Sequence, residues 1–443
     1  MADFQLSSAP AEAVRAAKFC VVDTIGAALG AHQDPQVAQV RQIFSALEPN
    51  GSPSTIWGYE AGLGMLRSAY INAMMAHTLE LDDVHVRSKT HIGTVVVPAA
   101  WALVEEYGLS GARLLEAVLC GYEIMARIGM GFGVTSHRKR GWHVTATAGT
   151  FGAAAVAAKL LGLNAERTLD ALGLAGTQSF GLWAFLEDGA TSKVLHPAHA
   201  AMTGMESALL AKAGMTGPGH ILQAKDGGLY SAMSDAPDIE AVCAGLGSAY
   251  EILALDKKVY PCCRSTHCAI DAALTLREQH GISAAEIAGI KVCTYEVGVQ
   301  QCAQSQTSLN PTLPAHAKFS TPYTVALAFI EGQVTTAHFE PSHIVRPEIR
   351  ALMELVQVEA DEFFSARYPD HWGCKMTCTL RDGRTYTVEI PDASGSVYVP
   401  LNEEQVVRKA RDTAGAAQLE LSDQSIEALL DMEHLPSVEG LLF

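Results

Sequence analysis

The segment RGWHVTATAGTFGAAAVAAKLLGL, residues 140–163, decides the class of fold. Its Ala and Leu residues, punctuated by Gly and Thr, predict a buried helix. Between residues 9 and 30 apolar side chains also recur at helical spacing, and Pro10 stands near the first turn, where its missing N–H does no harm. Further buried helices are predicted near residues 61–80, 93–107, 112–130, 198–213 and 402–416. Residues 1–250 are therefore expected to be almost wholly helical.

The pattern changes after Leu253. The segments IAGIKVCTYEVG (287–298), LVQVEAD (355–361) and GCKMTCTLRDGRTYTVEI (373–390) alternate or carry β-branched residues, which predicts strands. Asp382-Gly383 is typical of a hairpin turn, and a helical pattern resumes at residue 401. We therefore predict a mainly α protein with an inserted α+β domain. The large helical domain comprises residues 1–258 and 400–443, and the smaller α+β domain comprises residues 259–399.

Length, charge and cysteine content exclude several classes of protein. The 443 residues suffice for about two or three domains. The formal net charge of −17 repels phosphate backbones and anionic membrane surfaces, so neither nucleic acid nor a membrane is an expected partner. No apolar run approaches the roughly 18–20 residues of a bilayer span, and the N-terminus lacks the features of a signal peptide. Ten scattered cysteines indicate reduced thiols, so a cytoplasmic protein is expected.

Cationic residues stand beside histidines in four short segments, 87–91, 138–143, 193–196 and 257–267. In a chain this acidic, such clustering favours a pocket for an anion. The alternative is that each segment is an ordinary solvated edge of a helix. The sequence predicts that five of these side chains converge on one multiply charged ligand: Arg87, Lys193, Lys258, Arg264 and His267.

The segment LELDDVHVRSKTHIG, residues 79–93, mixes carboxylates and imidazoles between two apolar helices. Such a mixture forms hydrogen-bonded networks that hold a histidine in one tautomer for proton transfer. A metal site and a helix-capping cluster are the alternatives, but the Asp and His spacing is irregular and HExxH is absent. No metal is therefore predicted.

Other candidate motifs are weaker. Cys262, Cys263, His267 and Cys268 suggest zinc, but adjacent cysteines do not readily chelate one tetrahedral ion. The glycines at 149 and 152 lack the spacing of a nucleotide loop and follow no predicted strand. The segment around Ser179 is not GxSxG, so a serine hydrolase is not supported.

Six ordered segments resemble the MmgE/PrpD family. They are HTLELDDVHVRSKTHIGTVVVPAA, GYEIMARIG, RGWHVTATAGTFGAAAVAAKLLGL, SKVLHPAHAA, KVYPCCRSTHCAIDAAL and KFSTPYTVALAFIEG, and they run nearly end to end. The resemblance implies a helical domain with a smaller α/β lid, a homodimer, and an active site in the cleft between the domains. It also implies that the protein uses neither a metal nor an organic cofactor.

The family pattern carries over to particular residues. The acidic segment matches at Asp82 and Asp83, HxG matches at His91, and GxHxT matches at His143. SK matches at Lys193, KxYP matches at Lys258, and KFSxPY matches at Lys318 and Tyr323. Two positions depart from the dehydratases and the decarboxylase of the family. Val84 stands where those members have a hydroxyl, and Cys263 stands where the decarboxylase has a histidine. The segments ELDDVH, FLEDGATSK and CCRSTH most closely resemble the branch that contains iminodisuccinate epimerase.

The resemblance implies removal of a proton from the carbon next to a carboxylate of a small di- or tricarboxylic acid. An epimerase needs proton-transfer groups on both faces of that carbon, and we expect His91 or His143 on one face and Lys193 or Lys258 on the other. The predicted substrate-binding residues are Asp82, Asp83, Arg87, Cys263, Arg264, His267, Lys318 and Tyr323. The alternatives are a 2-methylcitrate-like dehydratase, a cis-aconitate-type decarboxylase, and a non-enzymatic protein that keeps the fold.

Overall fold

A computed structural model describes residues 1–48 and 54–442. Its contacts divide the chain into two compact units. Unit 1 comprises the described residues of Met1–Trp183, Ser192–Asp256 and Asn402–Phe443, and unit 2 comprises Ala184–Thr191 and Lys257–Leu401. The segment 184–191, which the sequence analysis places in the helical domain, groups with unit 2. At Gly189 a Cβ would lie only 2.6 Å from Nε2 of His316 in unit 2, so the backbone packs closely there.

Unit 1 is built from helices and one two-stranded ladder. Its elements are α1 (Ala11–Gly30), α2 (Pro35–Leu47), α3 (Met65–Thr78), β1 (Val84–His85), α4 (Gly93–Glu106), α5 (Gly111–Gly131), α6 (Val134–Lys139), α7 (Val144–Leu160), α8 (Ala165–Gly176), α10 (Leu195–Lys212), α11 (Leu229–Met233), α12 (Ile239–Cys243), β2 (Leu255–Asp256), α21 (Glu403–Ala416) and α22 (Asp423–Leu430). The long helices confirm the helical pattern predicted for residues 1–250.

Helix α7 lies at the centre of unit 1. All of its residues are buried, and it packs against α4, α5, α8 and α10. Small side chains permit this close packing: a Cβ at Gly149 would lie 2.9 Å from Cβ of Ala200 in α10, and one at Gly152 would lie 2.9 Å from Cβ of Met125 in α5. These glycines therefore serve helix packing, as expected for interiors packed at crystal-like density.

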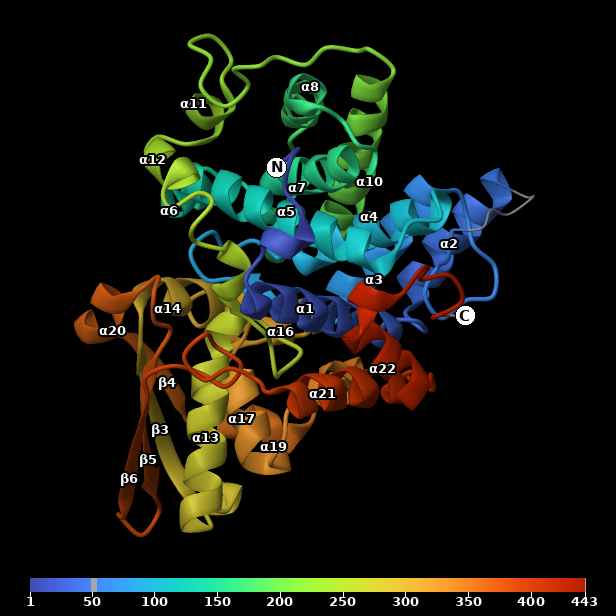
Figure 1. The fold of residues 1–443 in the computed structure, drawn as a ribbon. Helices are drawn as coiled ribbons and strands as arrows, with labels where there is room; N and C mark the ends of the chain where they lie inside the picture. The colour runs from blue at the N-terminus through green and yellow to red at the C-terminus, as the bar shows by residue number, and fades with distance from the viewer. Residues whose placement is uncertain (49–53, 443) are drawn as a thin grey trace. The chain divides into compact units, whose positions relative to one another are not determined.

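The C-terminal part of the chain completes the core of unit 1. Helix α21, red in Figure 1, lies beside α1, which is blue. Asn402 and Gln405 form a reciprocal capping box that starts α21. At Gly26 of α1 a Cβ would lie 2.5 Å from Cα of Ala410, so only glycine permits this approach. The two end segments of the described chain thus belong to one unit.

Unit 2 combines a four-stranded sheet with helices. Its elements are α9 (Phe185–Asp188), α13 (His267–His280), β3 (Ile287–Thr294), α14 (Glu296–Cys302), α15 (Gln306–Leu309), α16 (Pro314–Lys318), α17 (Thr321–Glu331), α18 (Pro341–Ile344), α19 (Pro347–Met353), β4 (Val356–Ala360), α20 (Glu362–Arg367), β5 (Cys374–Leu380) and β6 (Thr385–Ile390). The strand order is β4-β3-β5-β6, with β3 and β4 parallel and the other pairs antiparallel.

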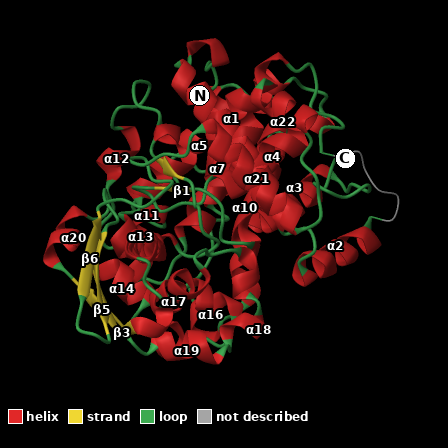
Figure 2. Cartoon of the chain, turned by 90° about the horizontal axis from the view of Figure 1, so that it is seen from below, coloured by secondary structure: helices red, strands yellow, loops and turns green. Residues whose placement is uncertain are grey.

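One face of this sheet is covered by helix α13, which packs on β5 and β6 (Figure 2) and on α17. Alternate residues of β5, from Cys374 to Leu380, are buried, as its sequence pattern predicts. The predicted hairpin at Asp382-Gly383 is confirmed, with a φ of 89° at Gly383. The first predicted strand ends early, because Glu296 already begins α14.

Strands are predicted from the sequence only after Leu253, and the short strand β1 corrects this expectation. Val84 and His85 pair antiparallel with Asp256 and Leu255 of β2. A strand of two residues is too short to show a periodic pattern in the sequence. Asp256, which pairs with Val84, lies 172 residues further along the chain. The predicted fold class, mainly α with a small mixed sheet, is confirmed. Among the described residues, every helix is too short or too polar to cross a bilayer.

Candidate active site

The segment between α3 and α4 builds the centre of the candidate site. Asp82 is 1% exposed, and its Oδ2 lies 3.0 Å from Nδ1 of His77 at the end of α3. The same oxygen lies 2.6 Å from Nδ1 of His91. The backbone of His91 is fixed in turn, because its N–H donates to Oγ1 of Thr145 in α7 over 3.1 Å and its carbonyl accepts a hydrogen bond from Thr94. One carboxylate thus lies against two imidazoles.

Asp83 has a different surrounding from its neighbour. Its Oδ1 accepts the N–H of Gly93, at the start of α4, over 2.9 Å, and its Oδ2 accepts the hydroxyl of Tyr122 over 2.6 Å. A carboxylate at the N-terminus of a helix is favoured by the helix dipole. Gly93 leaves room for this contact, because a Cβ there would lie 2.5 Å from Oγ1 of Thr24. Asp83 therefore fixes the loop that carries Asp82 and His91.

A second pair of imidazoles comes from α7 and α10. Nδ1 of His143, the residue before α7, lies 2.7 Å from Nδ1 of His196. The ring of His143 also contacts the edge of Trp183, with centroids 4.9 Å apart. The loop beside this pair is tightly packed: Gly181 has a φ of 103°, and its carbonyl accepts the N–H of His143. This loop therefore fixes the backbone of His143.

Lys193 supplies a buried cation to the same region. It lies in a 3-10 turn before α10 and forms an ion pair with Glu80, and both side chains are less than a tenth exposed. Glu80 has a φ of 57°, which is uncommon for a residue other than glycine. We call the group His77, Glu80, Asp82, His91, His143, Lys193 and His196 the imidazole cluster.

Burial holds several of these imidazoles neutral. It lowers the pKa of His77 to about 4, and the positive charge of Lys193 acts in the same direction. It lowers the pKa of His143 well below the ordinary value, with further lowering from His196 and Lys193. Burial also lowers the pKa of His196 to about 4. A neutral imidazole can donate a proton from one nitrogen and accept one at the other, which is the property that proton transfer requires.

Three residues of the cluster also form a set of metal-type ligands. Donor atoms of His77, Asp82 and His91 lie within 4.8 Å of one another. The Nδ1 atoms approach the Asp82 oxygen at 3.0 and 2.6 Å, which are hydrogen-bond distances. A zinc ion would need these nitrogens without protons, each about 2.0–2.1 Å from one common point. Of the two contacts with Asp82, only that of His77 has the geometry of a hydrogen bond, and the absence of a metal stays a prediction.

His85 and Ser88 of the 79–93 segment belong to a separate hydrogen-bond network. Nδ1 of His85 lies 2.8 Å from Oγ of Ser88, and its Nε2 lies 3.1 Å from Glu251. Arg127 is 2% exposed and forms an ion pair with Glu251 at 3.5 Å. Arg87 is exposed, and its charge acts on His85 and Glu251. The predicted role of Arg87 in binding a carboxylate stays a prediction.

Unit 2 holds a second group of the predicted residues. Lys258, Cys263, Arg264 and His267 are at most 9% exposed. The guanidinium of Arg264 donates to the carbonyls of Ser394 and Ala393 over 3.3 and 3.4 Å, and the N–H of Cys263 donates to the carbonyl of Lys318. Their convergence with Arg87 and Lys193, which belong to unit 1, stays a prediction.

Tyr323 lies in the core of unit 2. It is 0% exposed, and its hydroxyl donates to the carbonyl of His338. Its ring lies near that of Phe339, with centroids 5.9 Å apart. Lys318, at the end of α16, is half-buried and is the first residue of the KFSxPY segment, which ends at Tyr323. The hydroxyl of Tyr323 thus has a structural bond, and its role toward a substrate remains a prediction.

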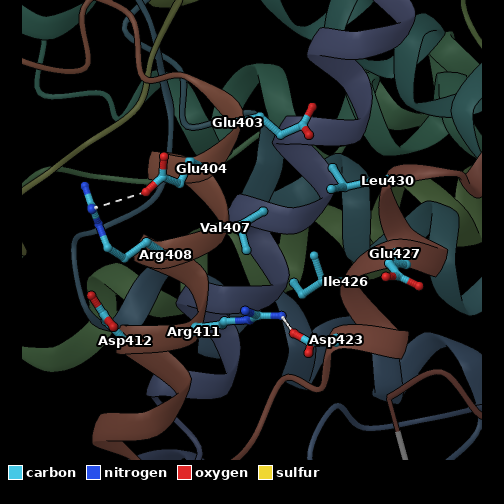
Figure 3. A pocket seen from close by; sticks show the side chains of 10 residues that line it. All are labelled: Glu403, Glu404, Val407, Arg408, Arg411, Asp412, Asp423, Ile426, Glu427 and Leu430. Atoms are coloured by element: carbon cyan, nitrogen blue, oxygen red, sulfur yellow. Dashed lines mark hydrogen bonds and ion pairs between the residues drawn. The ribbon is translucent and has the colours of Figure 1, made fainter.

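A groove of unit 1, with a volume of about 450 Å³, lies between α21 and α22. Figure 3 shows its two arginines, Arg408 and Arg411, directed toward Glu404 and Asp423. Five carboxylates line this groove against two guanidiniums: Glu403, Glu404, Asp412, Asp423 and Glu427. The excess of negative charge would repel a polycarboxylate, so the groove is no candidate for the substrate site.

Three members of the imidazole cluster were not predicted from the sequence: His77, Glu80 as the partner of Lys193, and His196. His77 and Glu80 were visible beside Asp82, since the segment HTLELDD contains all of them. His196 stood three residues after Lys193, so an imidazole next to a predicted functional lysine was the available signal. Nothing in the spacing, however, indicates that His196 meets His143, 53 residues earlier.

Relatives similar over most of the chain have names of lyases. The cis-aconitate decarboxylase of Aspergillus terreus is 27% identical over 98% of this chain and 91% of its own length. The human cis-aconitate decarboxylase is 27% identical over 94% of this chain and 86% of its own length. The 2-methylcitrate dehydratase of Escherichia coli (strain K12) is 25% identical over 80% of this chain and 75% of its own length.

These names contradict the predicted isomerase class, because decarboxylation and dehydration are lyase reactions. The prediction of an epimerase is therefore wrong, and the comparisons do not show the iminodisuccinate epimerase branch. The prediction relied on Val84 and Cys263, which are both buried. Val84 is 4% exposed in the β1–β2 ladder, and Cys263 is 9% exposed with its N–H bonded to Lys318.

Two family models match the chain along most of its length. The MmgE/PrpD N-terminal domain matches residues 1–242, and the MmgE/PrpD C-terminal domain matches residues 260–432. The first match covers α1 to α12 with the whole imidazole cluster, and the second covers the sheet of unit 2. The chain therefore belongs to the MmgE/PrpD family.

Proposed function

We propose that this protein is a lyase that removes CO₂ from a small unsaturated tricarboxylic acid of the cis-aconitate type. The observation that carries the proposal is the imidazole cluster, in which Asp82 and Lys193 surround three neutral histidines with buried charges of both signs. The cis-aconitate decarboxylases, which are similar over nearly the whole chain, support the same reaction.

The chemistry of decarboxylation fits these groups. When the C–C bond to a carboxylate breaks, CO₂ leaves and its bonding electron pair stays on the carbon skeleton, which then takes up one proton. The proposed donor is His91 or His143. His91 lies 2.6 Å from the carboxylate of Asp82, and the positive charge of Lys193 acts on His143. The negative charge of a bound polycarboxylate would raise the pKa of a nearby imidazole. Substrate binding would therefore favour protonation of the imidazole that supplies the proton to the product.

Dehydration is the second candidate, and the contact of His91 with Asp82 favours it. The negative charge of a carboxylate 2.6 Å from an imidazole increases the basicity of that ring, and dehydration begins with removal of a proton next to a carboxylate. The 2-methylcitrate dehydratases are the relatives that carry this name. In this reaction a base removes the proton, the C–O bond breaks, and an acid protonates the departing hydroxide to water.

Substrate carboxylates are proposed to bind Lys193, whose ammonium is the buried cation of the cluster. Lys258, Arg264, His267 and Lys318 of unit 2 stay predicted ligands of a polycarboxylate, as does Arg87 of unit 1. The homodimer that the family resemblance implies also stays a prediction, which analytical ultracentrifugation would test.

Proton NMR in D₂O separates the two reactions in one experiment. With cis-aconitate, we expect release of CO₂ and a product that carries one new C–D bond. With 2-methylcitrate, a dehydratase would instead give a new alkene and no CO₂. If the protein converts neither acid although it is folded, the proposed function is wrong.

A matched pair of variants locates the reaction in the cluster. His196→Asn should lower kcat about 10²–10⁴-fold if the His143–His196 pair moves a proton. His199 lies on the same helix but is only half-buried and contacts the ring of Phe180. His199→Asn should therefore keep kcat within about threefold. Equal losses in the two variants would remove the pair from the mechanism.

A further inference from the structure

Arg138 carries a half-buried positive charge for which the described chain supplies no anion. It lies in the last turn of α6, and its Nε is buried without a hydrogen-bond partner among the described residues. Burial lowers the pKa of its guanidinium to about 10, and no carboxylate of residues 1–48 and 54–442 acts against this shift. Partial removal of a cation from water is costly unless an anion replaces the lost hydration. An anion from outside the chain would compensate this charge.

The neighbours of Arg138 do not supply that anion. Lys139 is an exposed cation, and Arg140 forms an ion pair with Asp235 at 2.8 Å. His137 is 1% exposed, and burial lowers its pKa to about 3, so this ring is neutral near pH 7. A helix C-terminus favours cations, and the exposed Lys139 already meets that preference. The end of α6 therefore does not explain why Arg138 is half-buried.

The guanidinium of Arg138 lies over the ring of Trp183, with its carbon 4.2 Å from the ring centroid. The backbone fixes this indole, because its N–H donates to the carbonyl of Gly141 over 2.8 Å and Trp142 pairs antiparallel with Leu182. A cation–π contact holds the guanidinium in place but supplies no oxygen for its N–H groups. Because Arg138 is only half-buried, part of this positioned side chain is accessible to a ligand.

The same indole connects Arg138 to the imidazole cluster. The ring of Trp183 contacts that of His143 edge to face, with centroids 4.9 Å apart. The guanidinium carbon therefore lies at most 9.1 Å from the imidazole centroid, which is the sum of the two distances through the indole. A guanidinium–carboxylate hydrogen bond takes up about 2.7–2.9 Å of such a span, and contact with a reacting atom takes up about 3–3.5 Å. The remainder corresponds to a few C–C bonds, as in a small polycarboxylic acid.

We propose that Arg138 binds one carboxylate of a small polycarboxylic acid whose reacting carbon lies against His143. Arg138 thereby selects acids that carry a second carboxylate, since a monocarboxylate has no group left for the guanidinium once its only carboxylate lies beside the reacting carbon. The inference rests on the proposed function in taking His143 as a group that transfers a proton.

Isothermal titration calorimetry with propane-1,2,3-tricarboxylate tests this subsite without turnover, because this acid lacks the double bond of cis-aconitate. Arg138→Gln should raise its Kd about 10–100-fold, as expected for loss of a charge-assisted hydrogen bond. Arg138→Lys keeps the charge but loses the planar guanidinium, so the Kd should rise about three- to tenfold. Arg140→Gln is the matched control, because it removes the same charge two residues away, where Asp235 is the partner. Its Kd should stay within about threefold of the wild type.

Kinetics separate binding from positioning of the imidazole. With an acid that the wild type converts, Arg138→Gln should raise KM by a factor similar to the rise in Kd and keep kcat within about threefold. A substitution that only displaced His143 would instead lower kcat and leave the Kd of the tricarboxylate unchanged. That result would show that Arg138 has a structural role and would overturn the proposed subsite.

The remaining outcomes are equally decisive. The inference is wrong if the wild type does not bind the tricarboxylate, if folded Arg138→Gln binds it as tightly as the wild type, or if Arg140→Gln weakens binding equally. If Arg138→Gln does not fold, Arg138→Lys decides, and an unchanged Kd there overturns the inference. A wild type that binds the tricarboxylate through Arg138 but converts no tested acid would refute the proposed lyase and leave the carboxylate subsite standing.

Discussion

Lys409 on α21 joins three parts of unit 1, and its removal should destabilise the unit strongly. Its Nζ donates to Oδ1 of Asp23 on α1 over 2.7 Å and to the carbonyl of Leu81 over 2.7 Å. The side chain of Asp23 is 1% exposed and that of Lys409 is 10% exposed. Leu81 directly precedes Asp82, so the same ammonium holds the loop of the imidazole cluster.

The structure sets the expected magnitude. Lys409→Met keeps most of the aliphatic stem and removes the ammonium, which leaves the carboxylate of Asp23 buried. The other oxygen of Asp23, Oδ2, is also buried and has no hydrogen-bond partner within residues 1–48 and 54–442. Removing one member of a buried ion pair costs about 3–5 kcal/mol, because the remaining charge is uncompensated. Replacing both members by apolar residues is often neutral, so Lys409→Met with Asp23→Leu should regain most of the loss.

Urea denaturation followed by tryptophan fluorescence measures this effect in unit 1. Trp57 and Trp101 are both 0% exposed there and pack edge to face, with ring centroids 5.8 Å apart. We expect a loss of at least about 3 kcal/mol in Lys409→Met and a loss of no more than about 1 kcal/mol in the double variant. A single variant that loses less than about 1 kcal/mol, or a double variant as unstable as the single one, would refute the reasoning.

Four further outcomes follow from the same geometry. Asp82→Asn should lower kcat about 10²–10⁴-fold, measured with the acid that the wild type converts, because the amide no longer fixes an imidazole tautomer. Tyr122→Phe should cost about 1.5–3 kcal/mol of unfolding free energy, since the 2.6 Å bond to the Asp83 carboxylate is lost; a cost below about 0.5 kcal/mol would contradict this. Because the pKa values of His77 and His196 are lowered to about 4 in the folded chain, the unfolded chain binds more protons below pH 6.5. Stability should therefore be full above about pH 6.5 and fall toward pH 4, by up to about 1.4 kcal/mol per pH unit for each imidazole, as denaturation at several pH values would measure. Dialysis against a strong chelator should leave activity intact, and a loss that zinc restores would show that the predicted absence of a metal is wrong.

Local sequence patterns predict those parts of the structure that depend on residues close together in the chain. Helices such as α1 and α7, the β5–β6 hairpin and the closeness of Asp82 to His91 follow from periodicity and from short spacing in the sequence. The order of the family segments likewise predicted MmgE/PrpD membership, which the family models confirm. The finer choice of an epimerase is contradicted by the lyase names of the relatives, because two single-residue departures, Val84 and Cys263, were taken as signs of a different reaction.

Only the tertiary structure placed His196 against His143 and Lys193 against Glu80, which are 53 and 113 residues apart. The first of these contacts depends on which faces of α7 and α10 meet, and α7 is buried along its whole length, so its sequence favours no particular face. The structure also revealed that Asp82 and Asp83, adjacent and chemically identical, have separate tasks. One contacts two imidazoles and the other caps a helix and accepts the hydroxyl of Tyr122, because successive side chains of a loop point to different neighbours. The sequence determined which groups this protein has for proton transfer, and the packing of the helices decided which of them touch.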